Sequence, residues 1–301
     1  MTIRRRWWRK REVVVLAILL AVACQSEEII EDDVEFDADV DADVDIDVGE
    51  EDVEPIVCQG LFGAPGPATG LDDDQCSPEC ECSGEVWTAP TYDEAFVEGL
   101  HEWELVEALE VPDANPYETG DYEQGEGVCG LEIVDETELT YRLRSFESLS
   151  ELESAGARLA HYEPCGLCST LQDLAVYLEN HDLTEPVREC GFQGINAGEE
   201  SQTSCIEELG FSQGCAQIWS WNTSHTREEC LNICVTLMDA PHNEPDGSLN
   251  DCLACDEEKS GEVFKAVAGR TRRNSGLPSA ICRPCDEPVR LSHEDTPYVS
   301  D

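Results

Sequence analysis

Three pairs of cysteines in the sequence have the Cys-x-x-Cys spacing that redox sites and metal sites use. They are Cys165/Cys168, Cys252/Cys255 and Cys282/Cys285. The first pair follows an apolar segment and directly precedes a helical pattern. The apolar positions of that pattern are Leu171, Leu174, Ala175 and Leu178. Because a helix N-terminus stabilises a thiolate, Cys165 is a candidate for attack on disulfides.

The order of strand, Cys165-Gly-Leu-Cys168 and helix resembles the thioredoxin active site, and His161 lies four residues upstream. The match is incomplete, because Pro164 stands where thioredoxins have Trp and no Pro follows in a strand pattern. The half of the chain that follows has a helical pattern, and 14 other cysteines after Cys24 are available as partners. A redox pair must be free to cycle, whereas a structural cysteine is paired once. We therefore expect Cys165 and Cys168 to be structural, with a thiol–disulfide oxidoreductase as the alternative.

Metal and haem sites find little support. Two Cys-x-x-Cys pairs could supply the four thiolates of a zinc site, but 26 residues separate Cys255 from Cys282, more than in common zinc ribbons. No His follows any of the pairs, as covalent c-type haem would require. We predict no metal and no cofactor.

One hydrolase motif is present, but its context is wrong. Gly210-Phe-Ser212-Gln-Gly214 matches Gly-x-Ser-x-Gly. That motif places the serine between a strand and a helix. Here the preceding residues 205–209 have a helical pattern, so we interpret the motif as a helix stop and a turn, and we predict no catalytic residue.

Basic residues gather near the C-terminus of a very acidic chain. Between residues 259 and 290 there are seven basic and three acidic residues. The basic ones are Lys259, Lys265, Arg270, Arg272, Arg273, Arg283 and Arg290. Arg270, Arg272 and Arg273 either hold acidic segments of their own chain or form a site for an anionic ligand, since guanidinium groups bind carboxylates and phosphates in two-pronged geometry.

The N-terminus has the features of an export signal. Six basic residues within the first 11 precede an apolar stretch at 13–23. That stretch is too short for a membrane span, which needs roughly 20 apolar residues. Leu20-Ala-Val-Ala-Cys24 resembles the lipobox of bacterial lipoproteins. The resemblance implies that residues 1–23 are a signal peptide, that Cys24 carries lipid, and that Gln25, in place of Asp, directs the protein to the outer membrane or cell surface. An ordinary cleaved signal or an uncleaved anchor is the alternative.

The number of cysteines and the net charge characterise the part of the chain that follows the export signal. Of 17 cysteines, 16 remain after Cys24, an even number that indicates up to eight disulfides in an oxidising compartment. The net charge is -49, and removal of the six basic residues and one acidic residue of the signal takes it to -54. Such a chain repels nucleic acid, so nucleic acid is not expected as a partner.

Residues 24–55 have the composition of a disordered acidic tether. Acidic and small or apolar residues alternate at 37–48, which would line one face of a strand with like charges. Asp43, Asp45, Asp47 and Glu54 match ligand positions of an EF-hand loop, but Val48 stands where that loop needs Gly. We expect only weak binding of divalent cations there.

The fold class indicated for the remainder is α+β, as one globular unit. In residues 56–164 the patterns predict a helix at 93–110, strands at 128–134 and 139–146, a short helix at 148–155 and a strand at 157–162. Residues 165–301 predict short helices joined by disulfides. Their expected ranges are 171–180, 184–190, 200–209, 215–221, 226–239, one opening at 248–251, and 261–268. Cys230 and Cys234 share one helix face, from which they can reach neighbouring helices.

Three segments resemble an uncharacterised family of secreted, cysteine-rich proteins. They are CGLCSTLQDLAVYL, DLTEPVRECG and CDEEKSGEVFKAVAGRTRRNSGLPSAICRPC. The resemblance extends from Cys82 to the C-terminus and implies no activity. We therefore expect a noncatalytic, disulfide-stabilised surface lipoprotein, bound to a membrane by its N-terminal lipid, that displays a domain for an extracytoplasmic protein or an anionic ligand.

Overall fold

The first described segment contains only short strands. The computed structural model describes residues 57–297. The strands are β1 (Cys58–Gln59), β2 (Leu61–Phe62), β3 (Cys76–Ser77), β4 (Glu79–Cys82) and β5 (Glu85–Thr88). β4 lies between β1 and β5, and β2 pairs both with β3 and with β10 (Arg283–Pro284) near the C-terminus. Gly and Pro interrupt this segment often, which keeps its strands short.

A four-stranded sheet has the order β6–β8–β7–β9. Its strands are β6 (Glu104–Leu105), β7 (Val128–Asp135), β8 (Thr140–Phe146) and β9 (Arg158–Tyr162). β7 and β8 form the expected antiparallel hairpin, and α3 (Leu149–Ser154) leads into β9. Helices α1 (Glu94–Leu100) and α4 (Leu171–Glu179) pack together and share the main apolar core with Leu131 and Tyr141 of the hairpin. The α+β order of helix, hairpin, helix and strand is confirmed.

The helix expected at 93–110 is too long. α1 ends at Leu100, and the next residues run extended beside β8. The Glu104 amide donates to the Leu139 carbonyl at 2.8 Å, and the Val106 amide donates to the Tyr141 carbonyl at 2.9 Å. The edge of β8 thus supplies the hydrogen bonds that a continued helix would have made.

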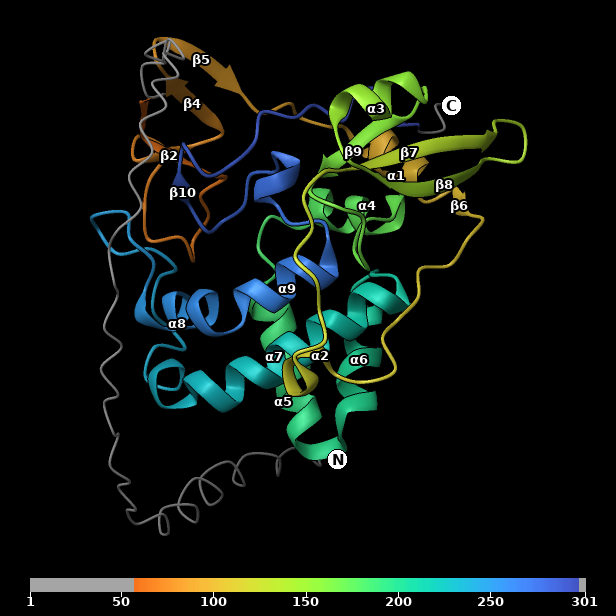
Figure 1. The fold of residues 1–301 in the computed structure, drawn as a ribbon. Helices are drawn as coiled ribbons and strands as arrows, with labels where there is room; N and C mark the ends of the chain where they lie inside the picture. Colours follow the sequence, from red (N-terminus) through yellow and green to blue (C-terminus); the bar gives the residue numbers. More distant parts are fainter. Residues whose placement is uncertain (1–56, 298–301) are drawn as a thin grey trace, which may run out of the picture. The chain divides into compact units, whose positions relative to one another are not determined.

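The second half of the chain is helical (Figure 1). Its helices are α5 (Thr184–Ala197), α6 (Glu199–Glu207), α7 (Gln213–Cys234), α8 (Asp251–Lys259) and α9 (Gly261–Ala268). The short helix α2 (Pro116–Thr119) lies against α7, and the 3-10 turn η1 (Arg273–Ser275) lies against β9.

Two helix starts in this half differ from the expectation. The expected helices at 215–221 and 226–239 are one continuous helix, α7. Thr226 does not cap a helix, because its hydroxyl bonds to the Asp256 carboxylate of α8. α8 is capped by the Asn250 side chain, which accepts from the Leu253 amide at 2.9 Å, instead of by Ser248.

All 16 described cysteines form disulfides. The pairs are Cys58–Cys82, Cys76–Cys282, Cys80–Cys285, Cys129–Cys165, Cys168–Cys215, Cys190–Cys205, Cys230–Cys255 and Cys234–Cys252. The expected reach of Cys230 and Cys234 to a neighbouring helix is confirmed, because both bond to α8. The protein is therefore a disulfide-stapled α+β fold. Within it, the described residues 57–297 belong to one compact unit.

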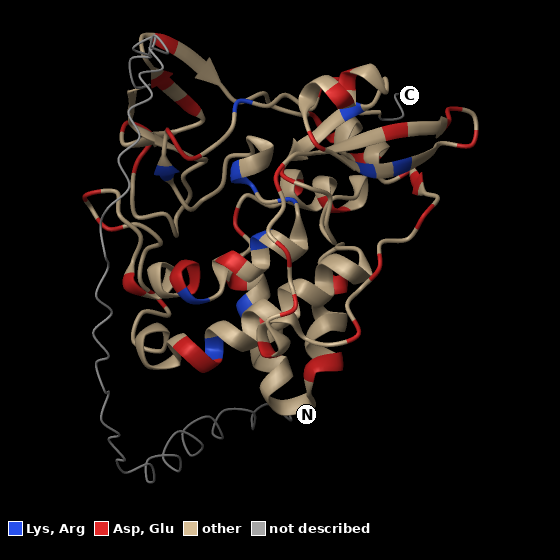
Figure 2. Cartoon of the chain, viewed as in Figure 1, with Lys and Arg blue, Asp and Glu red and all other residues tan. Residues whose placement is uncertain are grey.

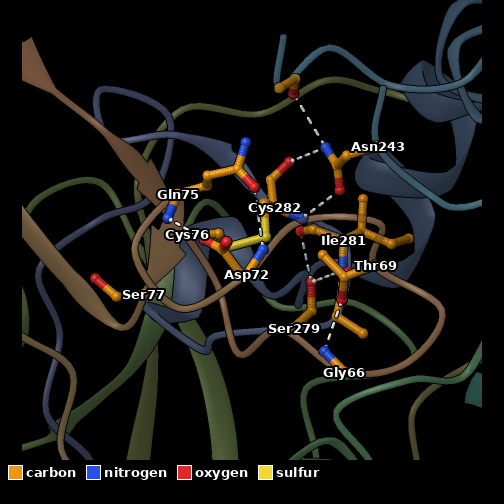
Figure 3. The surroundings of a disulfide bond; sticks show 12 residues. Gly66, Thr69, Asp72, Gln75, Cys76, Ser77, Asn243, Ser279, Ile281 and Cys282 are labelled. Atoms are coloured by element: carbon orange, nitrogen blue, oxygen red, sulfur yellow. Dashed lines mark hydrogen bonds between the residues drawn. A yellow bond between two sulfur atoms is a disulfide. The ribbon is translucent and has the colours of Figure 1, made fainter. Parts of the chain in front are cut away.

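Two disulfides join the first described segment to the last one. Cys76–Cys282 and Cys80–Cys285 each span more than 200 residues of sequence. Around the first of them, the Asn243 side chain both accepts from the Cys282 amide and donates to the Cys282 carbonyl, each at 3.0 Å (Figure 3). The C-terminal segment is thereby fixed to the rest of the fold.

Asp173 joins the N-termini of two helices. It accepts from the Thr170 hydroxyl at the start of α4, and from the Ser212 amide and hydroxyl at the start of α7, at 2.6, 2.8 and 2.9 Å. Burial raises the pKa of Asp173 to about 6 despite these hydrogen bonds. Ser212 also caps α7, because its hydroxyl accepts from the Cys215 amide at 3.4 Å, and the Gly210–Gly214 motif thus lies between the end of α6 and the first turn of α7.

Arg270 is completely buried where three segments meet. Its guanidinium donates to the carbonyls of Ala160 on β9 and of Cys168 and Ser169 before α4, at 3.1 to 3.2 Å. Arg270 therefore binds backbone carbonyls and not the carboxylates of an acidic segment. The expected acidic partner is wrong for this residue, since carbonyls of the irregular Cys165–Thr170 segment need a buried donor.

We predict that Arg270→Met lowers the free energy of unfolding by about 3 kcal/mol, because three buried carbonyls lose their donor. Arg290→Met is the matched control, since within residues 57–297 Arg290 pairs only with the exposed Glu85 at 3.4 Å and should contribute less than about 1 kcal/mol. Denaturant unfolding measures both. Equal effects of the two substitutions would show that Arg270 has no central structural role.

A second prediction concerns pH. Between pH 4 and 6 the carboxyl of Asp173 is ionised in the unfolded chain but keeps its proton in the folded one, because burial raises the folded pKa to about 6. Its contribution to the free energy of unfolding therefore falls by about 3 kcal/mol as pH rises through this range. The difference in the free energy of unfolding between the wild type and Asp173→Asn should show this fall. A difference in the free energy of unfolding that stays constant between pH 4 and 6 would contradict the raised pKa of Asp173.

Candidate ligand-binding cavity

A cavity of about 400 Å³ lies between α5, the C-terminal part of α7, α8, α9 and residues 271–283. Each of these elements contributes apolar side chains to its wall. They include Val187, Leu231, Leu253, Phe264, Leu277 and Ile281. Ligand pockets for small molecules usually measure about 300–1,000 Å³ and have mostly apolar walls. The cavity has the size and character of such a pocket.

Five large apolar side chains form an exposed lip on this cavity. They are Phe192, Ile195, Leu231, Val235 and Met238, with exposed fractions of 39% to 58%. Phe192 and Ile195 are three apart on α5, so they share one helix face; Leu231 lies in the last turn of α7, and Val235, four residues on, is the C-cap of that helix. A cluster of exposed apolar side chains beside a cavity marks a binding surface.

Disulfides hold the walls of the cavity in place. Cys230–Cys255 and Cys234–Cys252 fix α8 against the end of α7, and Cys190–Cys205 fixes α5 against α6. Cys190, which forms the disulfide, and Val187, which lines the cavity, are three residues apart on α5. The two side chains therefore lie on neighbouring parts of the helix surface. The cavity is therefore bounded by helices that cannot separate freely.

One side of the cavity carries a compact ion cluster around Glu257 of α8. Its carboxylate contacts Lys265 at 2.6 Å, Arg273 at 2.5 Å and Arg283 at 3.0 Å, and Arg273 also contacts Glu287 at 2.9 Å. Burial pushes the pKa of Glu257 upward, but the hydrogen bonds from Arg273 and Lys265 and the nearby positive charges outweigh burial and lower it to about 2. Glu257 is thus a fixed anion shared by three cations.

A polar network around Asp256 lies next to this cluster. Asp256 accepts from the Thr226 hydroxyl and, at 3.3 Å, from the Asn222 amide. Asn222 in turn accepts from the Tyr117 hydroxyl at 2.7 Å. Burial raises the pKa of Asp256. These contacts join α2, α7 and α8, and the Asn222 side chain is buried among them.

The cavity collects much of the positive charge of the chain. Six cationic side chains line it: Arg188, Arg227, Lys265, Arg272, Arg273 and Arg283. They are half of the 12 basic residues that follow residue 11. Only three carboxylates line the same wall, those of Asp182, Asp256 and Glu257, which gives a net charge of +3 with His neutral. Elsewhere acidic residues spread over the sheet and the helices (Figure 2).

The three arginines singled out from the sequence do not form one site. Arg270 points into the core, as described above. Arg272 donates to the carbonyls of Tyr177 and Asn180 at the end of α4, and also lines the cavity. Only Arg273 pairs with carboxylates. The expectation of acidic partners is therefore wrong for Arg272 too, because the free carbonyls at a helix C-terminus are already good acceptors for a cation.

Cys165 and Cys168 lie away from the cavity, in two separate disulfides. Cys165 is bonded to Cys129, and Cys168 to Cys215. His161 is buried and bonds to the Ser169 hydroxyl at 2.7 Å, while burial and the charge of Arg270 lower its pKa. Within residues 57–297, no group of three or more His, Cys, Asp or Glu side chains is placed to hold a metal ion.

Sequence reasoning missed the lip and two of the cations. The helix expected at 184–190 continues to Ala197, so Phe192 and Ile195 were not assigned to a helix face. Arg188 and Arg227 lie far in sequence from the basic residues at 259–290, and only the fold brings them to the same cavity. The helical spacing of Phe192/Ile195 and Leu231/Val235 was the available signal.

Comparisons with known proteins show similarity to one family over part of the chain, and that family has no assigned activity. A model of a family of unknown function, DUF8771, matches residues 199–291, which include α6 to α9 and the basic side of the cavity. No curated protein and no solved structure matches the chain. Among the described helices none is long and apolar enough to span a membrane. The chain is thus similar, over about a third of its length, to a family without an assigned role, and it is rich in cysteines that form disulfides.

Proposed function

We propose that this protein is an exported, noncatalytic binding protein whose ligand site is the cavity between α5 and α7–α9. The observation that carries this proposal is an apolar cavity of about 400 Å³ with an exposed apolar lip. Leaving large apolar side chains in water is unfavourable. The gathering of five of them in the lip of the cavity is therefore best explained by a ligand that covers them. The ligand needs an apolar body.

Export is supported by the eight disulfides, which are typical of an oxidising compartment. The basic and apolar N-terminal segment agrees with it. Lipid on Cys24 would anchor the protein in a membrane, and residues 24–55 would tether the binding domain to that anchor. Cys24 and the whole tether lie outside the described residues, so anchoring and cation binding there rest on the sequence.

The alternative of a thiol–disulfide oxidoreductase has weaker support. Catalysis by Cys165 and Cys168 needs the two sulfurs to bond to each other in the oxidised state. Here each sulfur is bonded to a different partner. A redox cycle would first require both of these crosslinks to rearrange.

Lipidation is tested directly by Cys24→Ser. In a bacterial host the wild type should partition into the detergent phase and incorporate labelled fatty acid, and Cys24→Ser should do neither. A variant that is processed and membrane-bound just like the wild type would refute the lipoprotein assignment, although the binding site could still exist.

Ligand binding is tested with the neutral fluorescent probe N-phenylnaphthylamine and residues 24–301 carrying Cys24→Ser, produced in an oxidising compartment. The wild-type cavity should bind the probe with a rise in fluorescence. Ile195→Glu and Leu231→Glu should weaken binding by about tenfold or more, because each places a carboxylate at the apolar lip.

Val134→Glu is the matched control, since Val134 is exposed to a similar extent on β7, away from the cavity. It should bind the probe like the wild type. No binding by any of these proteins, or equal loss in all three variants, would overturn the assignment of the cavity as a ligand site.

A further inference from the structure

We infer that the ligand of this cavity is an amphipathic anion, an aliphatic chain with one carboxylate or phosphate head, and that Lys265 and Arg283 bind the head. The inference rests on the proposed binding function and adds the chemical class of the ligand. Charge, the geometry of the cations and the position of the apolar wall support it independently.

The charge of the cavity wall is opposite to that of the chain. The chain carries -49 in total, yet the residues that line the cavity carry +3. Fixed charges on low-dielectric walls raise the local concentration of ions of opposite sign. A wall of positive charge inside an acidic protein selects small anions, while the acidic exterior repels large polyanions such as nucleic acid.

The cations have capacity for one more acceptor. In the described part of the chain, Lys265 and Arg283 each contact only one carboxylate, and it is the same Glu257. Both residues line the cavity, and the side chains of Lys265 and Arg283 are 37% and 19% exposed. An ammonium group has three donors and a guanidinium has five, which leaves donors for a ligand oxygen.

Other cations on the wall are not neutralised. Arg227 donates to the Gly191 carbonyl and to the neutral side chains of Gln202 and Ser224, at 3.3 to 3.4 Å. Arg272 donates only to carbonyls. Within residues 57–297, neither one has a carboxylate at ion-pair distance. Arg188 and Arg273 pair at 2.8 and 2.9 Å with Glu185 and Glu287, which do not line the cavity. In this part of the chain, the positive charge without a carboxylate partner therefore lies on Arg227 and Arg272.

Apolar residues continue directly from the cations to the lip. Leu253 lies one helical turn before Glu257 on α8, and Phe264 is adjacent to Lys265 on α9. The disulfides Cys230–Cys255 and Cys234–Cys252 hold this part of α8 beside Leu231 and Val235 of the lip. A ligand with its head at Lys265 and Arg283 can therefore place an aliphatic tail along this wall.

The test compares three ligands that share one tail. Decanoate, decyl phosphate and decanol are titrated calorimetrically, below their aggregation limits, into residues 24–301 carrying Cys24→Ser. At least one of the two anions should bind about tenfold more tightly than decanol, and which one does so identifies the head group. Lys265→Met should remove most of that advantage while binding of decanol stays within about twofold.

Lys259→Met is the matched control, because Lys259 pairs with the exposed Glu258 and does not line the cavity. It should leave all three affinities unchanged, and Arg283→Gln should repeat the effect of Lys265→Met. Melting curves confirm that each variant is folded.

Equal affinity for the three ligands, unchanged by Lys265→Met and Arg283→Gln, would overturn the anionic head and leave the apolar site intact. Equal loss in Lys259→Met would also overturn it, because the effect would then be one of total charge. Failure of all three ligands together with failure of the neutral probe would instead refute the binding function itself.

Discussion

The disulfides that join distant parts of the chain are the constraint on which the remaining structure depends. Cys76–Cys282 and Cys80–Cys285 close the chain near its two described ends, and Cys129–Cys165 links the sheet to the helical half. A chain with a net charge of -49 repels itself, and its core is divided among one large and three small clusters. Crosslinks over long loops reduce the entropy of the unfolded chain, which offsets that repulsion.

Within this frame, buried polar groups set the positions of the elements. Arg270 joins β9 to the segment before α4, and Asp173 joins the starts of α4 and α7. The ion cluster at Glu257 then connects α8, α9 and the C-terminal segment. The cavity is the space that these crosslinked helices leave between them. Its cations come from both sequence-distant helices and the basic C-terminal segment, which explains why an acidic protein has a positive cavity.

The sequence predicted what depends on local patterns. Alternation at 139–146 and the helical spacing after Cys168 gave the hairpin and α4, and the even number of cysteines indicated disulfides. The errors come from tertiary contacts. The edge of β8 ended the helix expected at 93–110, and the bond from Thr226 to Asp256 replaced a helix cap. The cavity could not be predicted, because Arg188, Arg227 and Arg283 meet only in the fold.

The most direct test of this account is the disulfide map of the mature protein, obtained by alkylation without reductant, proteolysis and mass spectrometry. The account predicts linked peptides for Cys129–Cys165 and Cys168–Cys215, for Cys76–Cys282 and Cys80–Cys285, and for the two bonds between α7 and α8. A bond between Cys165 and Cys168, or free thiols at those positions, would contradict the structural assignment and restore the redox pair. Free thiols on α7 and α8 would show that these two helices are not crosslinked and that disulfides do not hold this wall of the cavity.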